Sequence, residues 1–230
     1  MKLKKRLSAA AELVPEGARL LDIGTDHGFL PIALMERQRI RHGIAVDIGE
    51  GPLQRAREHI EVAGLSGGIE TRRSDGFSEI APGEADTAAI LGMGGALIRR
   101  IVSEGNPREK GIRLLILGPQ SEVPETRRFL LASGYEIERE RLILEDGKYY
   151  ALLRVRLEPQ EPPCPYTEEE LLLGGKLLPE DQATYEAFLR YRRTVVEGIL
   201  EELSAAAASE ERREELRHEL TLIASALSAR

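Results

Sequence analysis

The sequence has few of the residues on which several common classes of protein depend. Its 230 residues include no tryptophan, and aromatic residues make up only 4%. A row of exposed rings that stacks single-stranded nucleobases is therefore not expected. The single cysteine, Cys164, can form no internal disulfide, and one cysteine does not make a zinc site. We expect no metal centre.

Long apolar runs are absent as well. No stretch approaches the roughly 20 apolar residues that a membrane-spanning helix needs. The basic N-terminus, residues 1–6, is not followed by the apolar segment of a signal peptide. The sequence therefore predicts a cytoplasmic protein with no membrane partner, and a monomer is the simplest expectation.

Charge is divided unevenly along the chain. Residues 1–157 contain 24 Lys/Arg and 23 Asp/Glu, whereas residues 158–230 contain 8 and 16, which accounts for the net charge of −7. A nucleic acid should therefore meet the first part of the chain, through local basic clusters. The clearest cluster consists of Lys2, Lys4, Lys5 and Arg6. On charge alone, a solvated helix face is the simpler interpretation of this cluster.

Apolar, strand-like segments alternate with helix-like segments through residues 1–158. Strands are expected at 18–23, 43–47, 69–73, 85–91 and 113–117, with helices at 3–14, 31–38, 51–63, 96–103 and 124–133. This alternation is typical of a doubly wound, mostly parallel α/β sheet. Two further strands flank Asp146-Gly147, a hairpin signal, and predict an antiparallel edge after the parallel strands.

The rest of the chain predicts a linker and a small helical domain. Residues 159–165 contain four prolines, so we assign 159–179 to a proline-rich linker and a short helix that begins with a capping box at Thr167. Residues 180–230 contain two amphipathic stretches, which predict an antiparallel, coiled-coil-like helical hairpin. A coiled coil that binds a partner protein is the alternative.

The first predicted strand ends in an acidic residue, Asp22, and continues into the loop Gly24-Thr25-Asp26-His27-Gly28. This loop lacks the glycine triplet that brings a pyrophosphate to a helix N-terminus. Two carboxylates would repel a phosphate group, but they suit a ligand with positive charge. S-adenosylmethionine carries an ammonium and a sulfonium group and no phosphate, so the loop favours this cofactor over a nicotinamide dinucleotide.

Acidic residues or glycines also follow the next three predicted strands. Asp47-Ile48 follows the second strand, where a carboxylate can accept hydrogen bonds from both ribose hydroxyls. Asp75-Gly76 follows the third strand, and Gly92-Met93-Gly94-Gly95 follows the fourth. In many amino-methylating enzymes of this fold an Asn-Pro-Pro-aromatic run follows the fourth strand, and this chain lacks it. Because parallel strands end at one edge of a sheet, we expect one shared pocket. Each carboxylate taken alone could instead cap a helix or pair with an arginine.

With these motifs in place, the sequence resembles the bacterial tRNA adenine-N1 methyltransferases that act on adenine 22. The resemblance covers most of the chain and rests on Leu7-Ser8, residues 21–27, Asp75-Gly76, residues 92–98 and residues 145–150. It implies a class I methyltransferase of Rossmann-like fold with a C-terminal helical domain. It also implies S-adenosylmethionine as methyl donor, tRNA as substrate, and N1 of an adenosine in the D-loop region as acceptor.

The motifs and the resemblance together define the expected site. The expected cofactor contacts are Asp22, Gly24, Thr25, Asp26, His27, Gly28, Asp47, Ile48, Asp75, Gly76 and Gly92. Asp75 is our first choice, and Asp26 our second, for a carboxylate that stabilises charge on the methylated ring or accepts its N6 proton. The Gly92-Met93-Gly94 loop is expected to admit the acceptor base. The expected RNA contacts are Lys2, Lys4, Lys5, Arg6 and Gln120, the last in a position where relatives tend to have asparagine.

Other functions remain open at this stage. The chain could methylate another RNA, a small molecule or a protein. A nicotinamide-dependent oxidoreductase would share the fold, although the missing glycine triplet argues against it. A non-catalytic RNA-binding protein with this fold would bind tRNA in a salt-dependent way without transferring a methyl group.

Overall fold

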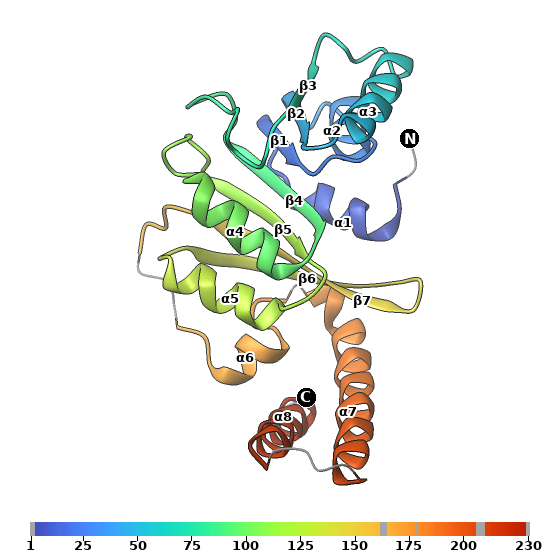
Figure 1. Cartoon of the computed structure of the whole chain (residues 1–230), viewed down its shortest axis with the longest axis vertical. Coiled ribbons are helices and arrows are strands. Elements are labelled where there is room, and N and C mark those ends of the chain that lie inside the picture. The colour runs from blue at the N-terminus through green and yellow to red at the C-terminus, as the bar shows by residue number, and fades with distance from the viewer. Residues whose placement is uncertain (1–2, 162–164, 178, 206–209, 229–230) are drawn as a thin grey trace. The chain divides into compact units, whose positions relative to one another are not determined.

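The computed structural model describes residues 3–161, 165–177, 179–205 and 210–228, with the backbone alone for residues 204 and 205 (Figure 1). The chain divides into two compact units, Met1–Cys164 and Pro165–Arg230. None of the helices in these described ranges combines the length and apolar character that a membrane-spanning helix requires.

The first unit contains a seven-stranded sheet with the order β3-β2-β1-β4-β5-β7-β6. The neighbouring pairs among β1 to β5 are parallel, whereas β7 is antiparallel to both β5 and β6. This confirms the doubly wound sheet with an antiparallel hairpin at its edge. The strands are β1 (Ala18–Ile23), β2 (Ile40–Asp47), β3 (Ile69–Arg73), β4 (Thr87–Met93), β5 (Leu114–Pro119), β6 (Glu136–Glu145) and β7 (Lys148–Arg156).

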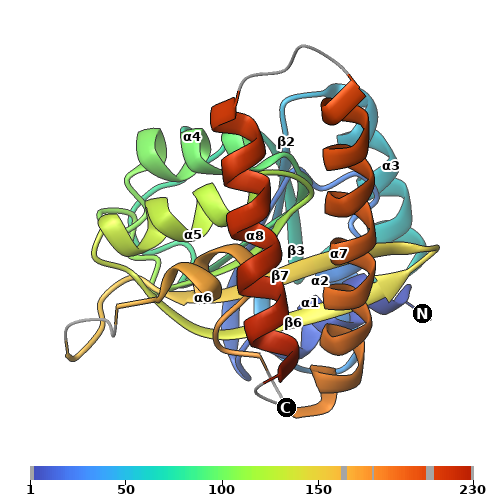
Figure 2. The ribbon, with the colours of Figure 1, turned by 90° about the horizontal axis from the view of Figure 1, so that it is seen from below.

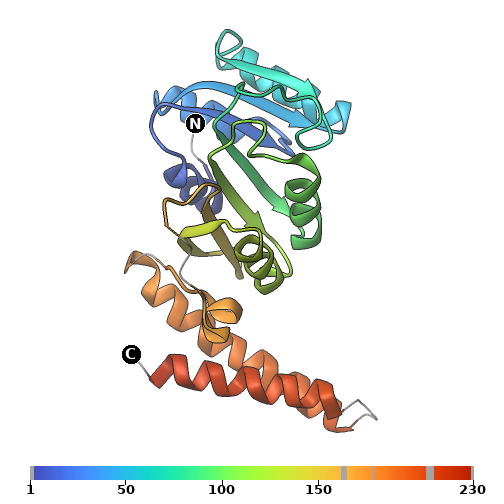
Figure 3. The same ribbon diagram turned by 90° about the vertical axis from the view of Figure 1, so that its left-hand side faces the viewer.

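Helices cover both faces of this sheet, which explains why its central strands are apolar on both sides (Figure 3). One face carries α1 (Lys5–Leu13), α2 (Phe29–Glu36) and α3 (Glu50–Val62), and the other carries α4 (Gly95–Gly105) and α5 (Val123–Ala132). The alanines of α1 pack with Leu20, Leu34 and Ile116 in one buried cluster. These contacts fix the start of α1 near the edge of the sheet where the parallel strands end.

Several element boundaries differ from the prediction by a few residues, and two of them lie beside that edge. Helix α2 begins at Phe29 rather than Pro31, because Gly28 adopts a left-handed backbone with φ 67° and starts the helix directly. Strand β4 extends to Met93, since pairing with β5 resumes at Pro119 after a register shift between Leu91 and Met93. Gly92 therefore belongs to the end of a strand, with φ 77°.

The second unit contains two long helices that run antiparallel, as Figure 2 shows. Helix α6 (Glu168–Leu173) begins at the predicted capping box, and a short 3₁₀ turn, Pro179–Asp181, precedes α7 (Gln182–Ala205) and α8 (Glu210–Ser228). Arg192 interrupts the apolar stripe of α7 because it forms an ion pair with Glu219 of α8, at 3.0 Å between Nη2 and Oε2. Cys164 and two of the linker prolines lie outside the described residues.

Candidate active site

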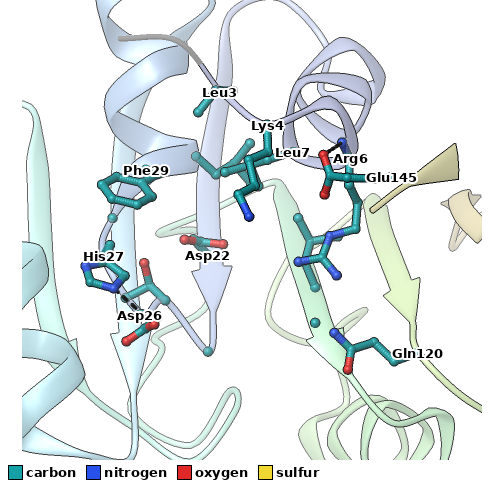
Figure 4. Close-up of a pocket in the computed structure, with 16 residues that line it drawn as sticks. Leu3, Lys4, Arg6, Leu7, Asp22, Asp26, His27, Phe29, Gln120 and Glu145 are labelled. Carbon is teal, nitrogen blue, oxygen red and sulfur yellow. Dashed lines mark hydrogen bonds and ion pairs between the residues drawn. The ribbon is translucent and has the colours of Figure 1, made fainter. Parts of the chain in front are cut away.

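A cavity of about 670 Å³ lies at the edge of the sheet where the parallel strands end (Figure 4). Its walls come from the start of α1, the loop between β1 and α2, the end of β4, and single residues after β5 and at the end of β6. The lining residues are Leu3, Lys4, Arg6, Leu7, Asp22, Gly24, Thr25, Asp26, His27, Gly28, Phe29, Leu30, Leu91, Gly92, Gln120 and Glu145. All of them belong to the first unit.

The loop after β1 is held tightly against β2. The backbone N–H groups of Gly24 and Thr25 both donate to the carbonyl oxygen of Val46, at 2.9 and 3.0 Å. Gly24 has φ 77°, and a Cβ at this position would lie 2.0 Å from Cε of Met93. Only glycine fits this turn without displacing Met93. Met93 does not line the cavity and acts here as a packing residue beneath the loop.

Asp22 is the buried carboxyl group of the cavity, with 7% of the residue exposed. Burial, together with the nearby charge of Asp47, raises its pKa to about 6. Ionised Asp22 is thus costly in the free protein, and a positively charged ligand group beside it would offset that cost. Asp22 is therefore suited to hold a cation.

One further polar atom in the cavity wall has no partner. Nδ1 of His27 is buried and makes no hydrogen bond within the described ranges, whereas the buried hydroxyl of Thr25 lies beside the carboxyl group of Asp22 and partly offsets the rise in its pKa. Buried polar atoms are nearly always paired in folded proteins. A polar ligand in the cavity would satisfy Nδ1 of His27, which indicates a binding site rather than a packing gap.

Asp26 is engaged differently from Asp22. Its carboxylate pairs with Arg55 of α3 and lies 3.2 Å from Nε2 of His27. The hydrogen bond from Arg55 lowers the pKa of Asp26, so the carboxylate stays ionised and is a poor proton acceptor. This geometry favours a role for Asp26 in shaping the loop over the predicted catalytic role.

Three rings are stacked at the cavity wall, a feature that the sequence did not reveal. His27 stacks on Phe29 at 4.9 Å between ring centroids, and Phe29 stacks on His59 at 5.1 Å. Nδ1 of His59 lies 3.0 Å from the carbonyl oxygen of His27 and ties α3 to the loop. The close spacing of His27 and Phe29 in the sequence could have indicated that their rings stack. The third ring, His59, joins them only because α3 packs beside the loop, which the sequence does not show.

The residues after β2 lie next to this cavity rather than in its wall. Oδ1 of Asp47 accepts the backbone N–H of Gly49 at 2.8 Å, and the side chain stays half-buried. Ile48 is 65% exposed. Asp47 ends the strand that pairs with β1 and Ile48 follows it, so both residues can continue the site beyond Asp22.

Asp75 and Gly76 do not share this cavity, contrary to the expectation of one common pocket. They line a separate hollow of about 430 Å³ with Phe77, Glu104 and Lys110. Oδ1 of Asp75 lies 3.8 Å from Nη2 of Arg100 in α4. The reason is the packing of the segment after β3, where Phe77 is buried so closely against α4 that a Cβ at Gly105 would lie 2.3 Å from its ring.

The glycines at the end of β4 and directly after it divide into two kinds. Gly92 lines the cavity, whereas Gly94 is the N-terminal cap residue of α4 and lies outside the wall. Gly95 is required by packing, because a Cβ there would lie 2.5 Å from the carbonyl oxygen of Ser121. Of the predicted acceptor loop Gly92-Met93-Gly94, only Gly92 faces the cavity.

The N-terminal basic cluster lies partly in the cavity wall. Lys4 and Arg6 line it, Lys5 is exposed, and Lys2 lies outside the described residues. The guanidinium of Arg6 lies over the Tyr150 ring, 4.7 Å from its centroid, and its backbone N–H donates to Oε1 of Glu145 at 3.2 Å. Gln120, an expected RNA contact, also lines the cavity, whereas Glu145 was not predicted as a site residue.

Comparisons with known proteins agree with this arrangement. The model of the methyltransferase domain family matches residues 3–153. The chain is 34% identical, over 94% of its length and 92% of the relative, to the tRNA (adenine(22)-N(1))-methyltransferase of Bacillus subtilis.

Solved structures give the same result. The chain superposes with a TM-score of 0.86 and 31% identity on a putative tRNA (m1A22) methyltransferase of Streptococcus pneumoniae in complex with S-adenosyl-L-methionine, covering 98% of this chain and 100% of that one. The TrmK protein of M. capricolum, in complex with the cofactor product S-adenosyl-homocysteine, matches with a TM-score of 0.83 and 25% identity over 99% of both chains.

Proposed function

The chain belongs to the methyltransferase domain family and, within it, to the tRNA (adenine(22)-N(1))-methyltransferases, and we propose that it transfers a methyl group from S-adenosylmethionine to N1 of adenosine 22 in tRNA. The observation that carries the proposal is the chemistry of the cavity wall. A buried carboxyl group with a pKa of about 6, Asp22, shares the cavity wall with the Thr25 hydroxyl beside it and with the unpartnered Nδ1 of His27. These groups fit a ligand that offers both positive charge and hydrogen-bonding atoms.

We assign the residues that hold the cofactor by their position along the sheet edge. Asp22 and the loop 24–28 would bind the amino-acid portion, with the ammonium group compensating the buried charge of Asp22. Asp47 would accept hydrogen bonds from the ribose hydroxyls, with Ile48, Asp75 and Gly76 beyond it on the adenine side. When bound, the cofactor supplies a methyl group on a positively charged sulfur.

We place the acceptor base on the opposite side of the cavity, at Gly92 and Gln120. Gly92 has no side chain and a left-handed backbone, so it leaves room for a base to approach closely. Adenine N1 is normally engaged in pairing or tertiary contacts, and the nucleotide must therefore be turned out of its helical or tertiary context to react. Lys4, Lys5 and Arg6, beside the cavity, would contact tRNA phosphates.

The catalytic part is proposed to comprise residues 1–158, followed by a linker at 159–179 and a helical domain at 180–230. The whole cavity wall comes from one chain, so no second copy is needed to complete it. We therefore propose that the protein acts as a monomer, in the cytoplasm.

The proposal is tested by incubating the purified protein and labelled S-adenosylmethionine with two tRNA transcripts that differ only in carrying adenosine or guanosine at position 22. We expect label in the adenosine transcript alone, and no transfer by Asp22→Asn. Equal labelling of both transcripts would contradict the proposed acceptor. Cofactor binding without any transfer to tRNA would identify a methyltransferase with another substrate.

A further inference from the structure

We propose that Glu145 is a catalytic residue, whose carboxylate accepts a hydrogen bond from the N6 amino group of the acceptor adenine and stabilises the positive charge that the ring acquires. The inference rests on the proposed function and assigns to that reaction a residue that the motifs after β1 to β4 do not include. Glu145 is the last residue of β6, at the antiparallel edge of the sheet.

The position of Glu145 matches the acceptor side of the cavity. Figure 4 shows Glu145 and Gln120 on one side of the pocket, with Asp26, His27 and Phe29 on the other side and Asp22 between them. The cofactor loop thus occupies one wall, and Glu145 belongs to the wall that faces it. A base that enters beside Gly92 and Gln120 would meet Glu145 along one of its edges.

The other carboxylates near the sheet edge have other partners or lie at other positions. Asp22 lies at the cofactor end, Asp26 pairs with Arg55, and Asp75 lines the separate hollow next to Arg100. Glu145 accepts only the neutral backbone N–H of Arg6, at 3.2 Å. Among the described residues, no arginine or lysine forms an ion pair with it. Its negative charge is therefore held by the N-terminus of α1 and not by a cationic side chain, and the residue lines the cavity.

A carboxylate without a cationic side chain as partner matches the needs of the reaction at this place. As the lone pair of adenine N1 forms a bond to the methyl carbon, the carbon–sulfur bond breaks and sulfur keeps the electron pair. The positive charge thus passes from sulfur to the adenine ring and is shared with the N6 amino group, and no proton has to leave. A carboxylate that contacts N6 stabilises the transition state more than the uncharged base.

Gln120 supports this assignment. Its backbone N–H donates to the carbonyl oxygen of Met93 at 2.9 Å, which holds the residue beside Gly92. Within the described ranges its carboxamide makes no hydrogen bond, so its donor and acceptor are both available to a base edge. Glutamine suits the N7 and N6 positions of adenine, which leaves the second N6 hydrogen for Glu145.

The test is Glu145→Gln, which keeps an oxygen to accept the N–H of Arg6 and removes only the charge. We expect the single-turnover rate of methyl transfer to fall about 100-fold, the usual loss when one charge-stabilising group is removed. The affinities for S-adenosylmethionine and tRNA should stay close to those of the wild type. The matched control is Asp146→Asn, at the adjacent position, where an 80% exposed side chain lies outside the cavity wall and φ is 50°, which asparagine tolerates.

A second substrate separates a catalytic role from a structural one. A tRNA with purine riboside at position 22 has N1 but lacks the N6 amino group. If Glu145 acts on N6, Glu145→Gln should slow this tRNA hardly at all relative to the wild type. A wild-type rate for Glu145→Gln on normal tRNA, or an equal slowing of both tRNAs, would overturn the inference. If the wild-type protein itself formed no 1-methyladenosine, the proposed function would fail, and the role of Glu145 with it.

Discussion

The guanidinium of Arg6 in α1 lies over the ring of Tyr150 in β7, with 4.7 Å between Cζ and the ring centroid. Two further contacts join the same N-terminal segment to the β6–β7 hairpin: the backbone N–H of Arg6 donates to Glu145, and Nζ of Lys4 lies 3.8 Å from Oδ2 of Asp146. The start of α1 is thereby held at the rim of the cavity, with basic side chains beside the entrance. The first prediction concerns the contribution of this charge to tRNA binding.

Replacing Arg6 with alanine should weaken the binding of tRNAs of any sequence by a similar factor, because a phosphate contact carries no sequence information. The slope of log K against log salt should become smaller by about 1. The measurement is a tRNA binding titration at several salt concentrations. Arg113→Ala is the matched control, since Arg113 precedes β5 at the opposite edge of the sheet and its side chain is 76% exposed. Equal weakening by both variants would indicate a general charge effect.

The second prediction concerns the pH dependence of stability. The folded-state pKa of Asp22, about 6, lies above its ordinary value of 3.8, so the folded protein holds this proton more tightly than the unfolded chain. The contribution of Asp22 therefore favours folding below about pH 4 and is lost as pH rises through 6, at a cost of up to about 3 kcal/mol.

Asp22→Asn should therefore raise the unfolding temperature of the cofactor-free protein at pH 7.5 but change it little at pH 4. The same variant should lose S-adenosylmethionine binding, which is the usual conflict between stability and function at a binding site. Thermal unfolding at both pH values tests this, with Glu61→Gln on the exposed face of α3 as control. A gain of the same size at both pH values would show that burial of the charge is not its cause.

The third prediction separates cofactor binding from chemistry at Asp75. Because Asp75 lies outside the cavity that contains Gly92 and Gln120, Asp75→Ala should raise the KM for S-adenosylmethionine while the rate at saturating cofactor stays near that of the wild type. The sequence alone made Asp75 the first choice for the catalytic carboxylate, which predicts instead that this variant abolishes methyl transfer. Steady-state kinetics with varied cofactor decide between the two, because a lost rate at saturation would restore Asp75 as the catalytic carboxylate.

The fourth prediction concerns Gly95. A Cβ at this position would meet Ser121 O at 2.5 Å, Thr126 Oγ1 at 2.7 Å and Glu122 O at 2.9 Å, and two of these atoms are backbone. Gly95→Ala should therefore lower the free energy of unfolding by about 1–3 kcal/mol. Chemical denaturation measures this loss. Gly67→Ala is the control, since nothing lies within 4 Å of a Cβ there and φ is negative or extended.

Much of the fold could be predicted from the sequence because its signals are local. The alternation of apolar strands and amphipathic helices predicted the sheet, and Asp146-Gly147, with φ of 50° and 75°, has the backbone that the hairpin signal implied. The loop 24–28 could be assigned to the site for the same reason. Its glycines and carboxylates are contiguous, and strand order alone places them at the sheet edge.

The remaining site residues could not be predicted because their positions depend on packing between distant segments. Asp75 was expected in the main cavity, but the burial of Phe77 against Gly105 draws its segment toward α4. Glu145 enters the cavity wall only because α1 packs beside the β6–β7 hairpin. No periodicity or motif in the sequence indicates that Phe77 packs against Gly105 or that α1 packs beside the hairpin.

The most direct test of the central claim is to map the modified nucleoside in unmodified tRNA after incubation with the purified protein and S-adenosylmethionine. Digestion to nucleosides followed by mass spectrometry identifies the product, and reverse transcription, which stops at a base methylated on its pairing edge, locates it. The account predicts 1-methyladenosine at position 22 and at no other position, with none formed by Asp22→Asn. Methylation at another atom or another position, or no methylation, would contradict it.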